Sequence, residues 1–255
     1  MLINPNTSTA TTAMMTAIAR RTLRELGATA GAATAHGVTA HSATAHSATA
    51  HRATVHGATV HGVIAHGATV RGVTVPRGPG MLTDPAALRA AAPEVLAAGL
   101  RAAAEGDCAA LLVGAFGDPG LAALRAATAL PVAGLGEAAL LEAAADGRPF
   151  GIATTTPLLA DAIAERVADL GLADLYTGVR LTAGTPERLS ADPALLLDRL
   201  ERAVRACAER DGARAVVIGG GPLGEAAEEL RARCAVEVVA PIPAACRALS
   251  RLLSG

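Results

Sequence analysis

From residue 68 onward, short β-branched and aliphatic runs alternate with Ala-, Leu- and Arg-rich stretches of helical length. This alternation is typical of strand–helix units that form parallel sheets, so it predicts an α/β fold. Strands are expected near 1–4, 68–75, 109–115, 131–135, 149–154, 176–182, 214–219 and 236–239. Helices are expected near 8–26, 84–105, 119–129, 136–146, 156–170, 192–210, 222–233 and 243–253.

Length and charge limit the possible partners. A chain of 255 residues, 51% hydrophobic and 18% charged, can bury a full core as one large domain or as two lobes. A formal net charge of −1 provides no long-range field to attract nucleic acid or an anionic membrane. No apolar run reaches the roughly 18 residues of a bilayer span. We therefore expect a cytoplasmic protein without nucleic-acid or membrane partners.

The cysteine pattern and the absence of lysine exclude several kinds of chemistry. The four cysteines have neither CxxC nor other metal-site spacing, so we expect free thiols and no metal site; they are Cys108, Cys207, Cys234 and Cys246. Lysine is absent from the chain, which excludes a Schiff base and a GK[ST] phosphate loop. No cofactor is predicted.

Residues 28–67 contain a tandem repeat of five residues that carries every histidine of the chain. A five-residue step does not bring these side chains onto one face of either a helix or a strand, so a single ordered metal site is not expected. A low-complexity insertion that catalysis does not need is the preferred interpretation. A pentapeptide β-helix and a loosely chelating tract are the alternatives. The histidines are His36, His41, His46, His51, His56, His61 and His66.

Four unusual strings follow predicted strands. The only two asparagines of the chain lie in NPNTS at 4–8, and the other strings are GAFGDPG at 114–120, ATTTP at 153–157 and IGGGPLG at 218–224. Ligands of open parallel sheets bind beyond the carboxyl ends of the strands, so these loops are expected to meet at one crevice. Ser8, Asp118 and Thr156 can cap the helices that follow, which leaves backbone N–H groups available to an anion.

The last string also satisfies GxGxxG through Gly219, Gly221 and Gly224. Pro222 interrupts this dinucleotide fingerprint, and the acidic residue of the next strand, Glu237, lies near its beginning rather than its end. A nicotinamide cofactor is therefore not expected.

Together these strings resemble the aspartate/glutamate/hydantoin racemase superfamily, and especially its hydantoin and allantoin racemase branch. The matching segments are INPNTS at 3–8, VPRGPGMLTDP at 75–85, AFGDPGL at 115–121, FGIATTTP at 150–157 and VIGGGPL at 217–223. The resemblance implies two similar lobes with the active site between them, no cofactor, and proton transfer at a carbon next to a carbonyl. The expected lobes are 1–134, completed by 238–255, and 135–237.

The family places one cysteine on each face of the substrate carbon, because inversion needs a base on one side and an acid on the other. The matching positions here are Ala115 and Gly220, and none of the four cysteines obviously replaces them. The other ionisable residues near the loops are Arg77, Asp84, Asp118 and Glu137. Only Asp118 is retained as a candidate base, although a cap of helix 119–129 is its preferred role.

Two functions follow from the resemblance. The first is a cofactor-independent racemase or epimerase of a hydantoin, allantoin, aspartate or glutamate type. The second is a non-catalytic binding or regulatory protein that has lost the two-thiol mechanism; a lyase or cis–trans isomerase is a third alternative. A homo-oligomer is possible. The expected substrate-binding residues are Asn6, Thr7, Ala115, Phe116, Thr154, Thr155, Gly220, Gly221 and Pro222.

Overall fold

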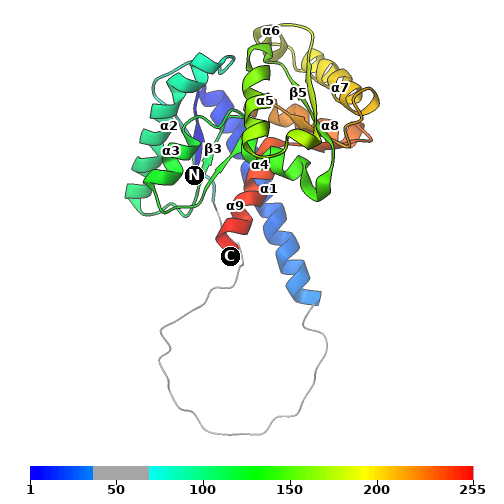
Figure 1. Cartoon of the computed structure of the whole chain (residues 1–255). Coiled ribbons are helices and arrows are strands. Elements are labelled where there is room, and N and C mark those ends of the chain that lie inside the picture. The colour runs from blue at the N-terminus through cyan, green and yellow to red at the C-terminus, as the bar shows by residue number, and fades with distance from the viewer. Residues whose placement is uncertain (37–68, 255) are drawn as a thin grey trace, which may run out of the picture.

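The computed structural model describes residues 1–36 and 69–254, which form two parallel four-stranded sheets flanked by helices (Figure 1). The first sheet has the order β2-β1-β3-β4, from β1 (Leu2–Asn4), β2 (Gly72–Thr74), β3 (Leu111–Val113) and β4 (Val132–Gly134). The second has the order β6-β5-β7-β8, from β5 (Phe150–Thr154), β6 (Tyr176–Leu181), β7 (Ala215–Ile218) and β8 (Glu237–Val239). The predicted α/β class is confirmed, and each predicted strand is present among the described residues.

The helices connect and cover these sheets. They are α1 (Thr9–His36), α2 (Pro85–Glu105), α3 (Leu121–Ala127), α4 (Leu135–Ala143), α5 (Ala160–Asp169), α6 (Pro186–Ser190), α7 (Pro193–Glu209), α8 (Gly224–Arg233) and α9 (Pro241–Ser254). Short 3₁₀ turns lie at η1 (Ala145–Gly147), η2 (Pro157–Leu159), η3 (Ala173–Leu175) and η4 (Gly221–Leu223). No helix in the described ranges is both long and apolar enough to cross a membrane.

Two helices differ from the sequence expectation. Helix α1 continues past the expected end at residue 26 to His36, through an alanine-rich stretch that also contains Gly27 and Gly31. Helix α6 lies outside the predicted set, and it begins where the Thr185 side chain accepts a hydrogen bond from the N–H of Arg188. Residues 37–67 of the pentad array, with all its histidines except His36, lie outside the described residues.

The attachment points of the array lie far from the carboxyl ends of the strands. Helix α1 begins just after the carboxyl end of β1 and runs back past the sheet, so that the end of α1 lies beyond the amino-terminal edge of the sheet (Figure 1). The described chain resumes at Thr69, three residues before β2 begins, on the same amino-terminal edge of the sheet. Both ends of the array therefore join the protein on the amino-terminal side of the first sheet.

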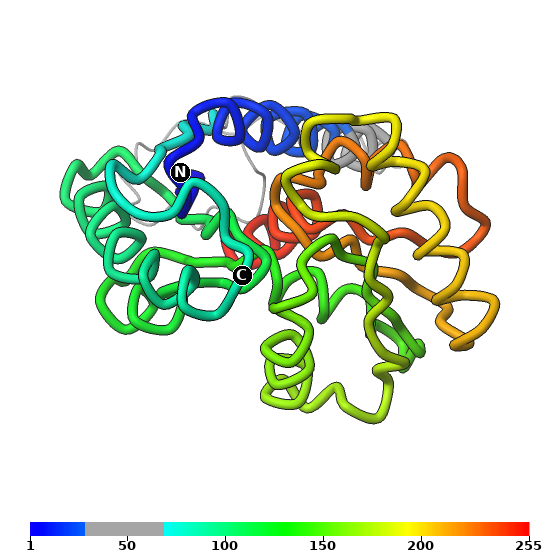
Figure 2. Tube along the Cα trace, turned by 90° about the horizontal axis from the view of Figure 1, so that it is seen from above, coloured from blue at the N-terminus to red at the C-terminus, as the bar shows by residue number. Residues whose placement is uncertain are grey.

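One of the apolar core clusters joins the two sheets. A single buried cluster contains Leu2 and Leu112 of the first sheet together with Phe150 and Ile152 of the second. Helix α9 packs against α1 and α4, and Figure 2 shows these segments between the two halves. The expected lobe boundaries stay a prediction. In the second sheet, β8 pairs with β7.

The shared core generates a stability prediction. Phe150 is fully buried, so Phe150→Ala should lower the free energy of unfolding by about 3–5 kcal/mol, measured by urea denaturation. Leu158 is 67% exposed, and the matched control Leu158→Ala should stay within about 0.5 kcal/mol of wild type. Equal effects of the two substitutions would contradict this account of the core.

Candidate functional site

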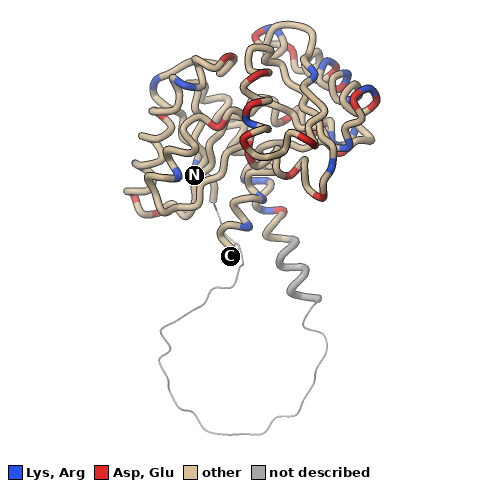
Figure 3. Tube along the Cα trace, viewed as in Figure 1, with Lys and Arg blue, Asp and Glu red and all other residues tan. Residues whose placement is uncertain are grey.

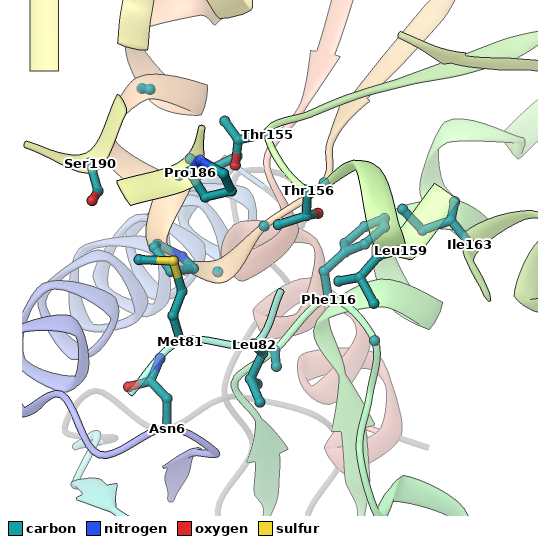
Figure 4. Close-up of a pocket in the computed structure, with 18 of the residues that line it drawn as sticks. Asn6, Met81, Leu82, Phe116, Thr155, Thr156, Leu159, Ile163, Pro186 and Ser190 are labelled. Atoms are coloured by element: carbon teal, nitrogen blue, oxygen red, sulfur yellow. The ribbon is translucent and has the colours of Figure 1, made fainter. Parts of the chain in front are cut away.

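A cavity of about 460 Å³ lies where the four predicted loops meet, beyond the carboxyl ends of β1, β3, β5 and β7 (Figure 4). Its loop lining consists of Asn6, Gly114, Ala115, Phe116, Gly117, Thr155, Thr156, Gly219, Gly220, Gly221, Pro222 and Leu223. The first two of these strands belong to one sheet and the last two to the other. The cavity is therefore bounded by both halves of the protein.

Most of the expected binding residues line this cavity, and two do not. Those that line it are Asn6, Ala115, Phe116, Thr155, Gly220, Gly221 and Pro222. Thr7 is exposed outside the cavity. Thr154 is buried, and its hydroxyl donates to the carbonyl oxygen of Gly219 at 2.7 Å. Thr154 thus connects the loops after β5 and β7 and does not face a ligand.

Asn6 presents a hydrogen-bond donor to the cavity. Its Oδ1 accepts from Asn4 Nδ2 and from the N–H of Ser8, each at 2.9 Å. These two bonds orient the amide so that Nδ2 remains available, and Nδ2 donates to no residue of the described chain. The side chain is only 5% exposed. A buried amide held in this way can donate to a ligand carbonyl without reorganising.

The second half of the protein contributes Thr155. This residue is buried and lines the cavity, and its hydroxyl has no hydrogen-bond partner among residues 1–36 and 69–254. Its neighbour Thr156 differs, because the Thr156 hydroxyl lies 3.0 Å from that of Thr154. Asn6 and Thr155 therefore bring uncommitted polar groups to one space from the two sheets (Figure 4).

Backbone donors complete the polar part of the site. The N–H groups of Ala115, Phe116 and Gly117 make no hydrogen bond to another described residue, whereas the flanking N–H groups do: Gly114 donates to Ile3 and Asp118 to Ala115. Three successive donors at the edge of a cavity suit an oxygen that gains negative charge during a reaction.

Most of the remaining lining residues are apolar, and many of them lie outside the predicted set. They come from the loop after β2, from η2 and α5, and from α6, and include Met81, Leu82, Leu159, Ile163, Pro186 and Leu189 (Figure 4). Two signals for them exist in the sequence: Leu159 and Ile163 share a helix face at a spacing of four, and a Thr-Pro-Glu helix start precedes Leu189.

The sequence model of the Asp/Glu/hydantoin racemase family matches residues 1–249. The chain belongs to this family. Similar curated proteins are the hydantoin racemase of Paenarthrobacter aurescens, 29% identical over 154 residues, and that of Rhizobium meliloti, 29% identical over 144 residues. The alignments cover 60% and 56% of this chain and 65% and 60% of those relatives, which is less than two thirds of their length.

Solved structures support the same fold. Allantoin racemase from Klebsiella pneumoniae has a TM-score of 0.77 at 23% identity, over 99% of this chain and 86% of that one. Allantoin racemase from Pseudomonas fluorescens has a TM-score of 0.72 at 20% identity, over 99% and 89%. An unliganded arylmalonate decarboxylase matches less, with a TM-score of 0.51 at 26% identity over 72% and 81%.

Ala115 and Gly220, the two positions at which the family resemblance leads one to expect thiols, both line the cavity. Ala115 is 7% exposed there. At Gly220, an added Cβ would lie 2.9 Å from Cγ and Cδ1 of Leu223, so a side chain at this position requires Leu223 to move. No cysteine of the described chain lines this cavity. The described titratable residues that line the cavity are Glu165, Arg166, Asp169, Glu225 and Glu229.

The four cysteines have other environments. Cys207 and Cys246 are buried, and burial raises the pKa of each thiol to about 12. Cys108 and Cys246 line a second cavity of about 330 Å³, and Cys234 is partly buried after α8. Within the described ranges, no group of three His, Cys, Asp or Glu side chains is arranged to hold a metal ion.

Asp118 does not have the expected capping role. Its Oδ1 accepts from the N–H of Gly136 at 2.9 Å and its Oδ2 from that of Glu137 at 2.7 Å, so it caps α4. Helix α3 begins instead at Leu121, with Gly120 at its N-cap and no side-chain cap. The expectation that Asp118 caps helix 119–129 is wrong, because its φ of +46° and the missing side chain of Gly134 let the carboxylate reach α4. Asp118 does not line the cavity.

The other ionisable candidates also have structural partners. Arg77 pairs with Glu94 on the surface at 3.0 Å, and Oδ1 of Asp84 caps α2 by accepting from the N–H of Ala87 at 2.9 Å. Glu137 accepts from two arginines near the cavity, Arg125 and Arg166.

The burial of Asp118 predicts a pH dependence of stability. Burial raises the pKa of this carboxyl to about 7, against the lowering effect of its two N–H donors. The unfolded chain loses the same proton near pH 3.9, so the stabilising effect of the bound proton is complete below about pH 4 and is lost as pH rises through about 7. Relative to Asp118→Asn, wild-type stability should therefore fall over this interval, by up to about 4 kcal/mol.

Urea denaturation at each pH from 4 to 8 measures this difference. Asp84→Asn is the matched control, because asparagine caps a helix as well as aspartate does, and its curve should follow that of wild type. If the Asp118→Asn curve ran parallel to wild type from pH 4 to 8, the raised pKa would be wrong.

Proposed function

We propose that this protein is a cofactor-independent racemase or epimerase of a small amino-acid derivative, with hydantoin- or allantoin-type substrates preferred over aspartate and glutamate. The observation that carries the proposal is the convergence of uncommitted donors from both sheets, Asn6, Thr155 and the N–H groups of 115–117, on one largely apolar cavity. Membership of the racemase family supports it.

The reaction would remove a proton from a carbon next to a carbonyl and return one to the opposite face. The carbonyl oxygen gains negative charge when the proton leaves, and the N–H groups of Ala115, Phe116 and Gly117 would stabilise it. Asn6 and Thr155 would hold the other polar groups of the substrate. The leucine-rich walls would exclude water, which strengthens these hydrogen bonds.

A second candidate is a binding or regulatory protein that retains the cavity without proton transfer. Ala115 and Gly220 favour it, since neither can donate or accept a proton through its side chain. The two candidates share one ligand class and differ only in turnover, so a proton-exchange measurement separates them.

Proton NMR in deuterated water tests the catalytic proposal. With allantoin, 5-benzylhydantoin, aspartate and glutamate as substrates, we expect protein-dependent loss of the α-hydrogen signal from the two hydantoin-type compounds. Thr155→Val should slow this exchange roughly tenfold or more by removing a hydroxyl from the cavity. Thr7→Val is the matched control, because Thr7 lies outside the cavity, and should exchange at the wild-type rate. Absence of exchange with the whole panel would favour the binding protein.

Restoring the thiols gives a further prediction. The double variant Ala115→Cys, Gly220→Cys should exchange the α-hydrogen about 100-fold faster than wild type, because general acid–base groups contribute rate factors of that order. Ala115→Cys alone is the easier substitution, since Gly220→Cys must displace Leu223. Ala226→Cys adds a thiol elsewhere in the cavity and should leave the rate unchanged. A folded double variant without faster exchange would show that the substrate is not held between these positions.

A further inference from the structure

Arg166 is the one basic side chain among the described residues that line the cavity. It lies on α5 three residues after Ile163 and seven after Leu159, which also line the cavity. Positions at these spacings share one face of a helix. Arg166 therefore lies on the side of α5 that lines the cavity, between the lining carboxylates Glu165 and Asp169.

Glu137 holds this guanidinium from outside the cavity. Arg166 Nη2 donates to Glu137 Oε2 at 2.6 Å. Arg125 of α3 also donates to Glu137, to Oε1 at 2.7 Å and to Oε2 at 3.0 Å. The Arg125 hydrogen bonds and the charges of both arginines lower the pKa of the Glu137 carboxyl against the effect of burial, so it remains ionised. Neither Glu137 nor Arg125 lines the cavity.

Arg166 keeps unused hydrogen-bonding capacity. Its Nε is buried and has no acceptor in the described part of the chain. About a third of the side chain, 33%, remains exposed, on a residue that borders the cavity. The exposed part of the guanidinium, rather than the buried Nε, can therefore donate to an acceptor on a ligand.

The surrounding charges favour an uncharged acceptor. Four exposed carboxylates line the cavity, from Glu165, Asp169, Glu225 and Glu229, against the single guanidinium of Arg166. Figure 3 shows acidic and basic residues spread over both halves of the protein. A ligand carboxylate would be repelled by this excess of negative charge. A carbonyl oxygen without a net charge accepts from Arg166 and avoids that repulsion.

We propose that Arg166 is a specificity-determining residue that binds an uncharged carbonyl on the substituent of the ligand, as in a ureido or amide group. Glu137 is the positioning residue that fixes the Arg166 guanidinium for this contact. The inference rests on the proposed function, because it takes the ligand ring to lie against residues 115–117 and Thr155.

Isothermal titration with three probes that share a hydantoin ring tests this inference. Allantoin carries an uncharged ureido group, 5-carboxymethylhydantoin a carboxylate, and 5-benzylhydantoin an apolar ring. Wild type should bind allantoin most tightly. Arg166→Met keeps the apolar stem of the side chain, and should weaken allantoin binding at least about tenfold while changing 5-benzylhydantoin binding less than about threefold.

Two further variants separate recognition from general disruption. Arg125→Met also removes an ion pair of Glu137 but takes nothing out of the cavity, so it should keep the wild-type Kd for allantoin within about threefold. Glu137→Gln keeps the size of the side chain and loses its charge, so it should weaken allantoin binding, by less than Arg166→Met does, and leave 5-benzylhydantoin binding unchanged. Thermal unfolding checks that each variant is folded.

Three outcomes overturn the inference. The first is an equal loss of allantoin affinity in the Arg166 and Arg125 variants. The second is that wild type binds 5-carboxymethylhydantoin most tightly of the three probes. The third is that wild type binds none of the three probes at millimolar concentration. Titration measures binding without turnover, so the proposed function fails separately. Arg166-dependent binding without deuterium exchange overturns only catalysis. If wild type catalyses deuterium exchange but Arg166→Met binds the three probes with the wild-type preference, only the role of Arg166 is overturned.

Discussion

The amino-terminal end of α4 is the junction on which the site depends. Asp118 accepts hydrogen bonds from two free N–H groups of this helix, and so connects the loop after β3 to the helix that leads into the second sheet. The next contact outward is Glu137, which joins α3 to α5 through two arginines. The loop that holds Ala115 and the helix α5 that forms a cavity wall therefore share one hydrogen-bonded support. Gly134 and Gly136 make this possible, since a side chain at either position would collide with the loop.

Much of the fold could be predicted, because its signals are local. Strands such as Phe150–Thr154 are short apolar runs bounded by turn residues, and their order along the chain alternates with helices. Parallel strands put their carboxyl ends on one edge, so the meeting of the four loops also followed from sequence. Ser8 was a correct cap, with Oγ accepting from the N–H of Thr11 at 3.2 Å.

The rest depends on contacts between distant residues. Asp118 looked like a cap for the helix beside it, and it reaches one 18 residues away because its backbone turns to positive φ. Thr154 and Thr155 are neighbours in a string of threonines, yet one is used inside the protein and the other faces the cavity. Spacing along one chain cannot distinguish such cases. The pairing of Glu137 with Arg166 is likewise invisible without the packing of α5.

The site of the pentad array has a consequence for how the gene can change. Both ends of the array join the protein at the amino-terminal edge of the first sheet, whereas the cavity lies at the carboxyl edge. Repeated DNA gains and loses units by slippage during replication, and each change here would add or remove five residues at the edge remote from the ligand. Copies of this gene that differ in repeat number should therefore encode the same cavity, so the number of repeats can drift while the ligand stays the same.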